Sequence, residues 1–166
     1  MKKLLTVLTV LTIGLSSFAS AGPEESFRYT SQKFNYNLTF DKIVVSDDID
    51  LVIYENATTN IQFDGSKENI ANVTWKVKKG VLYISSKTGS LKGKVIVTID
   101  VAKLAEITLE GRSSVRSLGN LDTPELNVYI KDGCFAAIRN TGSINIINID
   151  ESEMNVIQKK GNVTVR

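Results

Sequence analysis

The chain has 166 residues, with 20 Lys and Arg against 18 Asp and Glu, one cysteine and no histidine. This near balance of charge, without a run of Lys or Arg, argues against nucleic acid and anionic membrane surfaces as partners. A lone cysteine excludes an internal disulfide, and the lack of histidine excludes catalysis by a Ser-His or Cys-His pair.

Residues 1–21 have the pattern of a secretory signal peptide. Lys2 and Lys3 precede the apolar run "LLTVLTVLTIGL", and small residues follow this run up to Ala21. The run is shorter than the ~20 apolar residues that a membrane-spanning helix needs. We therefore expect cleavage after Ala21, no insertion in the membrane, and export to the periplasm or to the cell surface and the extracellular space.

A cluster of aromatic residues follows the signal peptide, at Phe27, Tyr29, Phe34, Tyr36 and Phe40. A stack of strands has an open end that must be covered, and aromatic side chains supply large buried areas. We therefore predict an N-terminal capping segment over residues 22–39. The alternative is a platform on which sugar rings stack.

From Phe40 onward, apolar and polar residues alternate with a period of two, which is typical of strands that bury one face. The run Val95, Val97, Ile99 and Val101 is an example. Between "VTWKVK" and "VLYISS", Lys79 and Gly80 predict a hairpin turn. Helical spacing is scarce, so the sequence predicts an all-β chain.

Three carboxylates in "SDDID", at Asp47, Asp48 and Asp50, are candidates for acidic chemistry. Calcium binds such oxygens, and glycoside cleavage needs two acids roughly 5 to 10 Å apart. The EF-hand pattern is absent, however, and Asp48 and Asp50 are the outward positions of an alternating strand. We expect a solvated face here, and the sequence assigns no metal-binding, cofactor-binding or catalytic residue.

The last sixty residues repeat with a near-constant period. Strand starts at Ile107, Leu126, Ile144 and Val163 are separated by 19, 18 and 19 residues. A period of about 20 residues with glycine corners predicts stacked coils of a β-solenoid, because no single unit buries its own apolar side. The positions expected to point into the coils are Ile107, Leu109, Val128, Ile130, Ile144 and Ile146.

The segment "GRSSV" in the first repeat is predicted to be a corner. Ser113 and Ser114 lack a histidine to deprotonate them, and the second glycine of a G-x-S-x-G elbow is absent. Replacement of Ser113 by Ala is therefore expected to change stability little. Cys134 lies among small and apolar residues, which favours a buried side chain over a reactive thiol.

The order of these features resembles the head GIN domain family, a domain of unknown function described as an adhesin head. The resemblance rests on "FDKIVV", "IDLVI", "GVLYI" and "ITLEGRSSV", and it covers Phe34 to Arg166. It implies a single-domain right-handed parallel β-helix with an N-terminal capping segment. The domain boundaries are then a signal peptide at 1–21, the cap at 22–39 and a β-helix domain at 40–166.

The sequence therefore predicts an exported bacterial protein that is not an enzyme and acts in surface adhesion, binding or envelope structure. The expected partner is a surface glycan or a protein, bound at residues that the sequence leaves unknown, and no cofactor is expected. The alternative is a carbohydrate-active enzyme that uses outward-facing carboxylates. Val163 and Val165 lie on a strand that leaves an unpaired edge, so self-association through this C-terminal edge is also expected.

Overall fold

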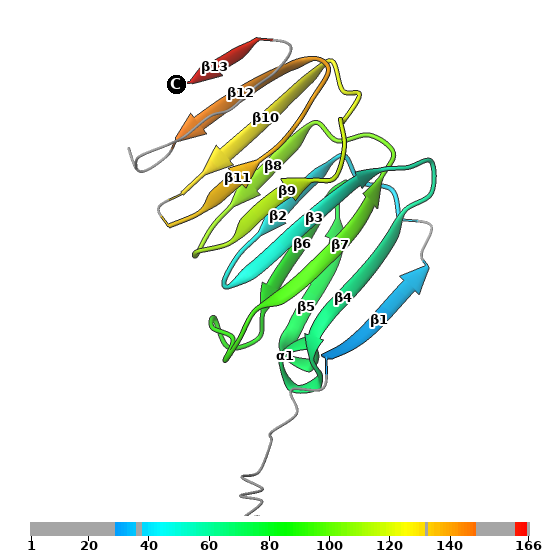
Figure 1. The fold of residues 1–166 in the computed structure, drawn as a ribbon, viewed down its shortest axis with the longest axis vertical. Helices are drawn as coiled ribbons and strands as arrows, with labels where there is room; N and C mark the ends of the chain where they lie inside the picture. The colour runs from blue at the N-terminus through cyan, green and yellow to red at the C-terminus, as the bar shows by residue number, and fades with distance from the viewer. Residues whose placement is uncertain (1–28, 36–37, 132, 149–161, 166) are drawn as a thin grey trace, which may run out of the picture.

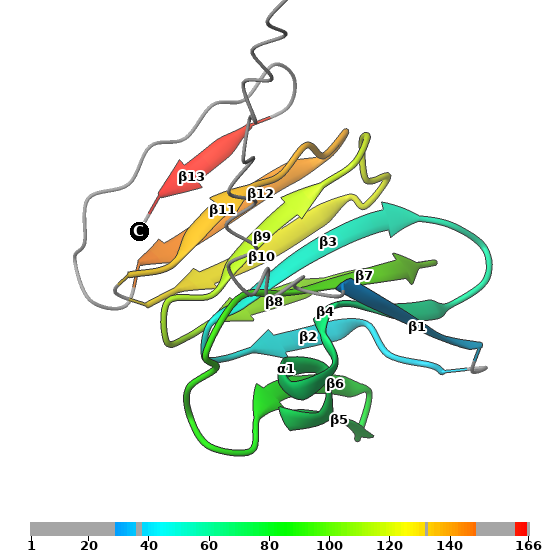
Figure 2. The ribbon, with the colours of Figure 1, turned by 60° about the horizontal axis from the view of Figure 1, so that its bottom comes forward.

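The computed structural model describes residues 29–35, 38–131, 133–148 and 162–165. The predicted signal peptide and its cleavage site after Ala21 lie outside these residues, as does half of the predicted capping segment. The described residues form two sheets that share one apolar core, seen as two layers in Figures 1 and 2.

We name the two sheets A and B. The described strands of sheet A lie in the order β1 (Tyr29–Asn35), β4 (Asn60–Ser66), β7 (Val95–Val101), β3 (Ile49–Glu55), β9 (Ser114–Ser117) and β11 (Phe135–Ala137). The described strands of sheet B lie in the order β13 (Val163–Val165), β12 (Ser143–Asn148), β10 (Glu125–Ile130), β8 (Glu106–Leu109), β2 (Lys42–Val45), β6 (Val81–Ser86) and β5 (Val73–Lys78).

Both sheets are mixed, which makes the prediction of a right-handed parallel β-helix wrong. In sheet A, β4 runs antiparallel to both β1 and β7, and in sheet B, β5 runs antiparallel to β6. The other neighbours are parallel, and neither sheet closes on itself within the described residues. The regular repeat begins only after β7, and the antiparallel pairs that depart from a parallel β-helix all involve strands before it, namely β1, β4 and β5.

The repeat itself produces parallel neighbours in sheet B. Its strands β8, β10, β12 and β13 lie side by side, so that Ile107 pairs with Val128 and Val128 with Ile146. The predicted inward positions are all buried, namely Ile107, Leu109, Val128, Ile130, Ile144 and Ile146. The sequence pattern therefore predicted correctly which face of these strands is buried.

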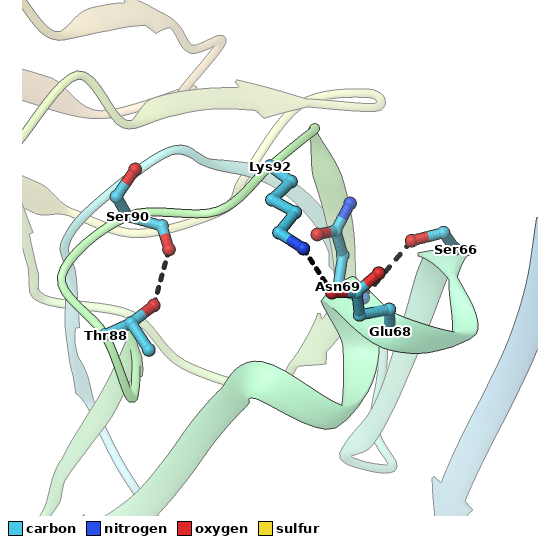
Figure 3. A network of polar contacts seen from close by, with 6 residues as sticks. All are labelled: Ser66, Glu68, Asn69, Thr88, Ser90 and Lys92. Carbon is cyan, nitrogen blue, oxygen red and sulfur yellow. Dashed lines mark hydrogen bonds and ion pairs between the residues drawn. The ribbon is translucent and has the colours of Figure 1, made fainter.

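Two local elements connect β4, β5 and β6. The predicted hairpin is confirmed, because β5 and β6 are joined through Lys79 and Gly80, whose φ angles of 52° and 76° fit a two-residue hairpin turn. The helix α1 (Lys67–Asn72) was not predicted. It begins at Ser66, whose Oγ accepts a hydrogen bond of 3.2 Å from the backbone N–H of Asn69, as Figure 3 shows.

Aromatic residues close the core at the end of the molecule where β1 and β5 lie. The ring of Phe34 packs edge-on against Phe63 at 5.8 Å and lies 6.2 Å from Trp75, between ring centroids. Phe40 is buried as well. These two members of the N-terminal aromatic cluster therefore supply core area and are not free to stack against a sugar.

Candidate functional site

The turns that carry the chain from sheet B to sheet A are stacked on one another. Asp47, Arg112 and Gly133 occupy equivalent turns, and all three have positive φ angles. Gly111 also has a positive φ, and a Cβ built there would lie 3.0 Å from the backbone nitrogen of Asp47. Glycine is therefore required at this position both for its backbone angle and for the close approach of the next turn.

Ser113 in this stack is a packed residue, although the sequence led us to expect that its replacement by Ala would change stability little. Its side chain is 1% exposed, and its Oγ donates a hydrogen bond of 3.3 Å to the carbonyl oxygen of Val45. Its Oγ also lies 3.7 Å from Sγ of Cys134, which is half-buried. The hydroxyl thus links one turn to the strand beside it, and this bond explains why a serine stands here.

The acidic side chains of "SDDID" are held by partners on neighbouring strands and turns. Asp48 forms an ion pair of 3.0 Å with Arg112, and Asp50 accepts hydrogen bonds from Lys94 at 3.1 Å and Ser114 at 2.6 Å. Asp47 accepts a bond of 2.7 Å from the backbone N–H of Ser86. The three carboxylates point to different partners, and no group of three His, Cys, Asp or Glu side chains in the described residues is placed to hold a metal ion.

The outer face of sheet B carries a row of side chains that the sequence did not single out. The register of the strands places Tyr129 beside Thr108, Thr108 beside Val44, and Val44 beside Tyr83. Ile147 extends the row beyond Tyr129. We call these five residues the tyrosine row; it crosses β12, β10, β8, β2 and β6, which Figure 1 shows side by side.

A polar row runs next to the tyrosine row on the same face. Asn145 donates hydrogen bonds to Asn127 at 3.1 Å and to Glu125 at 2.6 Å. Farther along, Lys42 and Glu106 form an ion pair of 3.0 Å, and Glu106 raises the pKa of Lys42 through that hydrogen bond and through its charge. Amide, ammonium and carboxylate groups therefore flank the tyrosine row along one side.

The other flank and the far end of the row are polar as well. Lys131 and Glu110 form an ion pair beside it. At the β5 end, Nζ of Lys76 lies 5.8 Å from the centroid of the Tyr83 ring, a distance at which a cation is attracted to an aromatic face. The result is a face on which two tyrosines lie between hydrogen-bonding groups.

One signal in the sequence could have found this face. Tyr83 in "GVLYISS" and Tyr129 in "LNVYIKD" both occupy outward positions of alternating strands, where polar residues are usual. The alternation of apolar and polar residues does not determine which strands become neighbours. The two tyrosines could therefore not be placed in one row from the sequence alone.

A family model described as "Putative auto-transporter adhesin, head GIN domain" matches residues 39–165 of the chain. No curated protein matches the chain. Among the described residues, no helix has both the length and the apolar character needed to cross a membrane.

Several solved structures have a similar fold. A "putative adhesin" from Parabacteroides merdae gives a TM-score of 0.63 at 17% identity, over 72% of this chain and 52% of that one. A "putative adhesin" from Parabacteroides distasonis gives 0.54 at 16% identity, over 84% and 71%. A "putative lipid binding protein" from Parabacteroides distasonis gives 0.61 at 13% identity, over 81% and 59%. These identities show the fold alone, and the chain spans about half the length of the Parabacteroides merdae protein.

The packed corner leads to a prediction about Ser113. Its replacement by Ala removes the hydroxyl that donates to Val45 and leaves that buried carbonyl with one partner fewer, so we expect a loss of about 1 kcal/mol in the free energy of unfolding. Urea denaturation followed by tryptophan fluorescence measures it. The matched control is Ser90→Ala, because Ser90 is exposed. Equal midpoints for the two variants would contradict the account of this corner.

Proposed function

The chain belongs to the head GIN domain family, and from this premise we propose that it is an exported, non-catalytic binding module that holds a surface polysaccharide on the outer face of sheet B. Export fits the signal-peptide pattern of residues 1–21, with cleavage after Ala21 and delivery to the periplasm or the cell surface. The adhesin names of the family and of two structural neighbours agree with a binding role at a surface.

The observation that carries the proposal is the tyrosine row. Neighbouring strands lie ~4.8 Å apart, so the three steps from β10 to β6 separate Tyr129 from Tyr83 by roughly 14 Å. Tyrosine presents an apolar ring with a polar tip, which suits the apolar faces and the hydroxyl groups of sugar rings. An extended polysaccharide laid along the row would meet one tyrosine near each end.

The polar row supplies the second half of such a site. Binding sites combine apolar contacts with a few placed polar groups, because the polar groups fix the orientation of the ligand. Asn145 is hydrogen-bonded to Asn127, and Lys42 is paired with Glu106, so the positions of these side chains are set before a ligand arrives. Groups that are held in place lose little conformational freedom on binding.

The alternative is a carbohydrate-active enzyme. The acids that the sequence offered for this role, Asp48 and Asp50, are bonded to Arg112 and Lys94. Asp48 lies in the turn before β3 and Asp50 lies in β3 of sheet A, whereas the tyrosine row lies on sheet B. A purely structural role in the envelope is the third class, and it requires neither saturable binding nor cleavage of a polysaccharide. Saturable binding of a polysaccharide distinguishes the proposal from the structural role, and the absence of new reducing ends distinguishes it from the enzyme.

The tyrosine row gives a direct test by affinity electrophoresis of the exported protein in gels that contain bacterial surface polysaccharides. We expect Tyr83→Ala and Tyr129→Ala each to weaken the binding by about tenfold, since the loss of one aromatic contact of roughly 1.4 kcal/mol corresponds to that factor. The control is Tyr54→Ala, which removes an exposed tyrosine from sheet A. Equal retardation of all variants, or new reducing ends in the incubated polysaccharide, would contradict the proposal.

We also propose self-association through β13. Among the described strands, β13 ends sheet B, and its Val165 is 53% exposed. A strand at the end of a sheet presents unpaired backbone groups to another chain. Sedimentation velocity at high protein concentration should show a dimer that Val165→Lys converts to a monomer, because charged side chains disfavour edge pairing. A monomeric wild-type protein would rule this association out.

A further inference from the structure

The outer face of sheet A carries a second set of exposed side chains, in a grid formed by β3, β9 and β11. The register aligns Val52 with Arg116 and Arg116 with Ala137. Tyr54 and Leu118 lie two positions farther along the same face, where the N–H of Leu118 donates to the carbonyl of Ile53. The exposed Arg139 follows β11 by two residues, and its backbone N–H donates to Oγ of Ser117, the residue before Leu118. Phe135 lies on the other side of the Arg116 row, opposite Ser114.

This face carries most of the large exposed apolar side chains found among the described residues. Five such residues are found in the described part of the chain, and three of them lie here: Tyr54 at 39%, Leu118 at 42% and Phe135 at 60% exposure. Val52 is outward-facing in the same grid but only 2% exposed, so the neighbouring side chains lie across it. We call Tyr54, Arg116, Leu118, Phe135 and Arg139 the arginine patch.

The two arginines of the patch are exposed and have no ion pair with a carboxylate of the described residues. The acids near the patch are engaged elsewhere. Asp100, beside Tyr54, accepts a hydrogen bond of 2.8 Å from Asn60. Asp50 bonds Lys94 and Ser114, and Glu55 accepts the backbone N–H of Asp122. The positive charge of the patch is therefore left for a partner to neutralise.

From this charge and the surrounding apolar groups, we propose that the arginine patch binds an acidic segment of another protein, with carboxylates on Arg116 and Arg139 and apolar side chains against Leu118 and Phe135 on either side of the Arg116 row. Arginine pairs with carboxylates through two parallel hydrogen bonds. Arginine and aromatic residues are also the residue types that dominate the energetics of protein interfaces.

The same observations disfavour the other classes of partner. Lipid surfaces are recognised by clusters of 4–8 basic residues, whereas the patch has two. Phe135 and Leu118 lack the polar tips that a hydroxyl-rich polysaccharide would meet, in contrast to the tyrosine row. The patch lies on sheet A and the proposed polysaccharide site on sheet B, so the inference does not rest on the proposed function, and one molecule could hold both partners at once.

The test begins with selection of a random twelve-residue peptide library displayed on phage against the exported protein, with the Arg116→Glu, Arg139→Glu double variant as counter-selection. The peptides retained by the wild-type protein are expected to combine Asp or Glu with apolar residues. The affinity of the most enriched synthetic peptide is then measured by fluorescence polarisation. We expect each single variant to lose at least tenfold and the affinity of the wild-type protein to fall with added salt.

Two controls keep the result specific. Lys78→Glu makes the same charge change on an exposed residue of sheet B and should bind the peptide like the wild-type protein. Thermal unfolding shows whether each variant is folded. If Arg116→Glu does not fold, Phe135→Ser tests the patch without a change of charge. The proposal is overturned if no acidic peptide is enriched, or if Lys78→Glu weakens peptide binding as much as the patch variants do. It is also overturned if the wild-type protein binds alginate or phosphatidylserine vesicles and the patch variants lose that binding.

Discussion

The burial of one face of the central strands is the constraint on which the rest of the structure depends. In sheet B, Ile43, Ile107, Val128 and Ile146 stand side by side in one inward row. Because side chains alternate between the two faces, the register that aligns this inward row also aligns the next residues outward. The tyrosine row consists of those next residues, so a packed core and a regular outer surface have the same physical cause.

The turns between the sheets protect that register. A slip by one residue would bring outward side chains into the core, and the stacked turns at Asp47, Arg112 and Gly133 resist it because each requires an uncommon backbone angle. The ion pair between Asp48 and Arg112 and the bond from Ser113 to Val45 join successive turns. The polar side chains of these turns thus have a structural role, and this role explains their presence without a part in catalysis.

The sequence predicted the buried faces and the hairpin because both depend on local patterns, namely alternation and the Lys79–Gly80 pair. It did not predict the antiparallel pairing of β4, since alternation is the same in parallel and antiparallel strands. It missed α1, whose six residues are too few to show helical periodicity. The tyrosine row and the arginine patch each depend on which strands become neighbours, and this follows from long-range packing that a single sequence does not encode locally.

The central claim is that the outer face of sheet B is where the protein meets a polysaccharide. The most direct measurement is the mapping of backbone amide chemical shifts in solution while a soluble fragment of the bound polysaccharide is added. The account predicts that the shift changes follow β10, β8, β2 and β6 and are largest near Tyr129 and Tyr83. Changes centred on the stacked turns or on the outer face of sheet A, with those four strands unaffected, would contradict it.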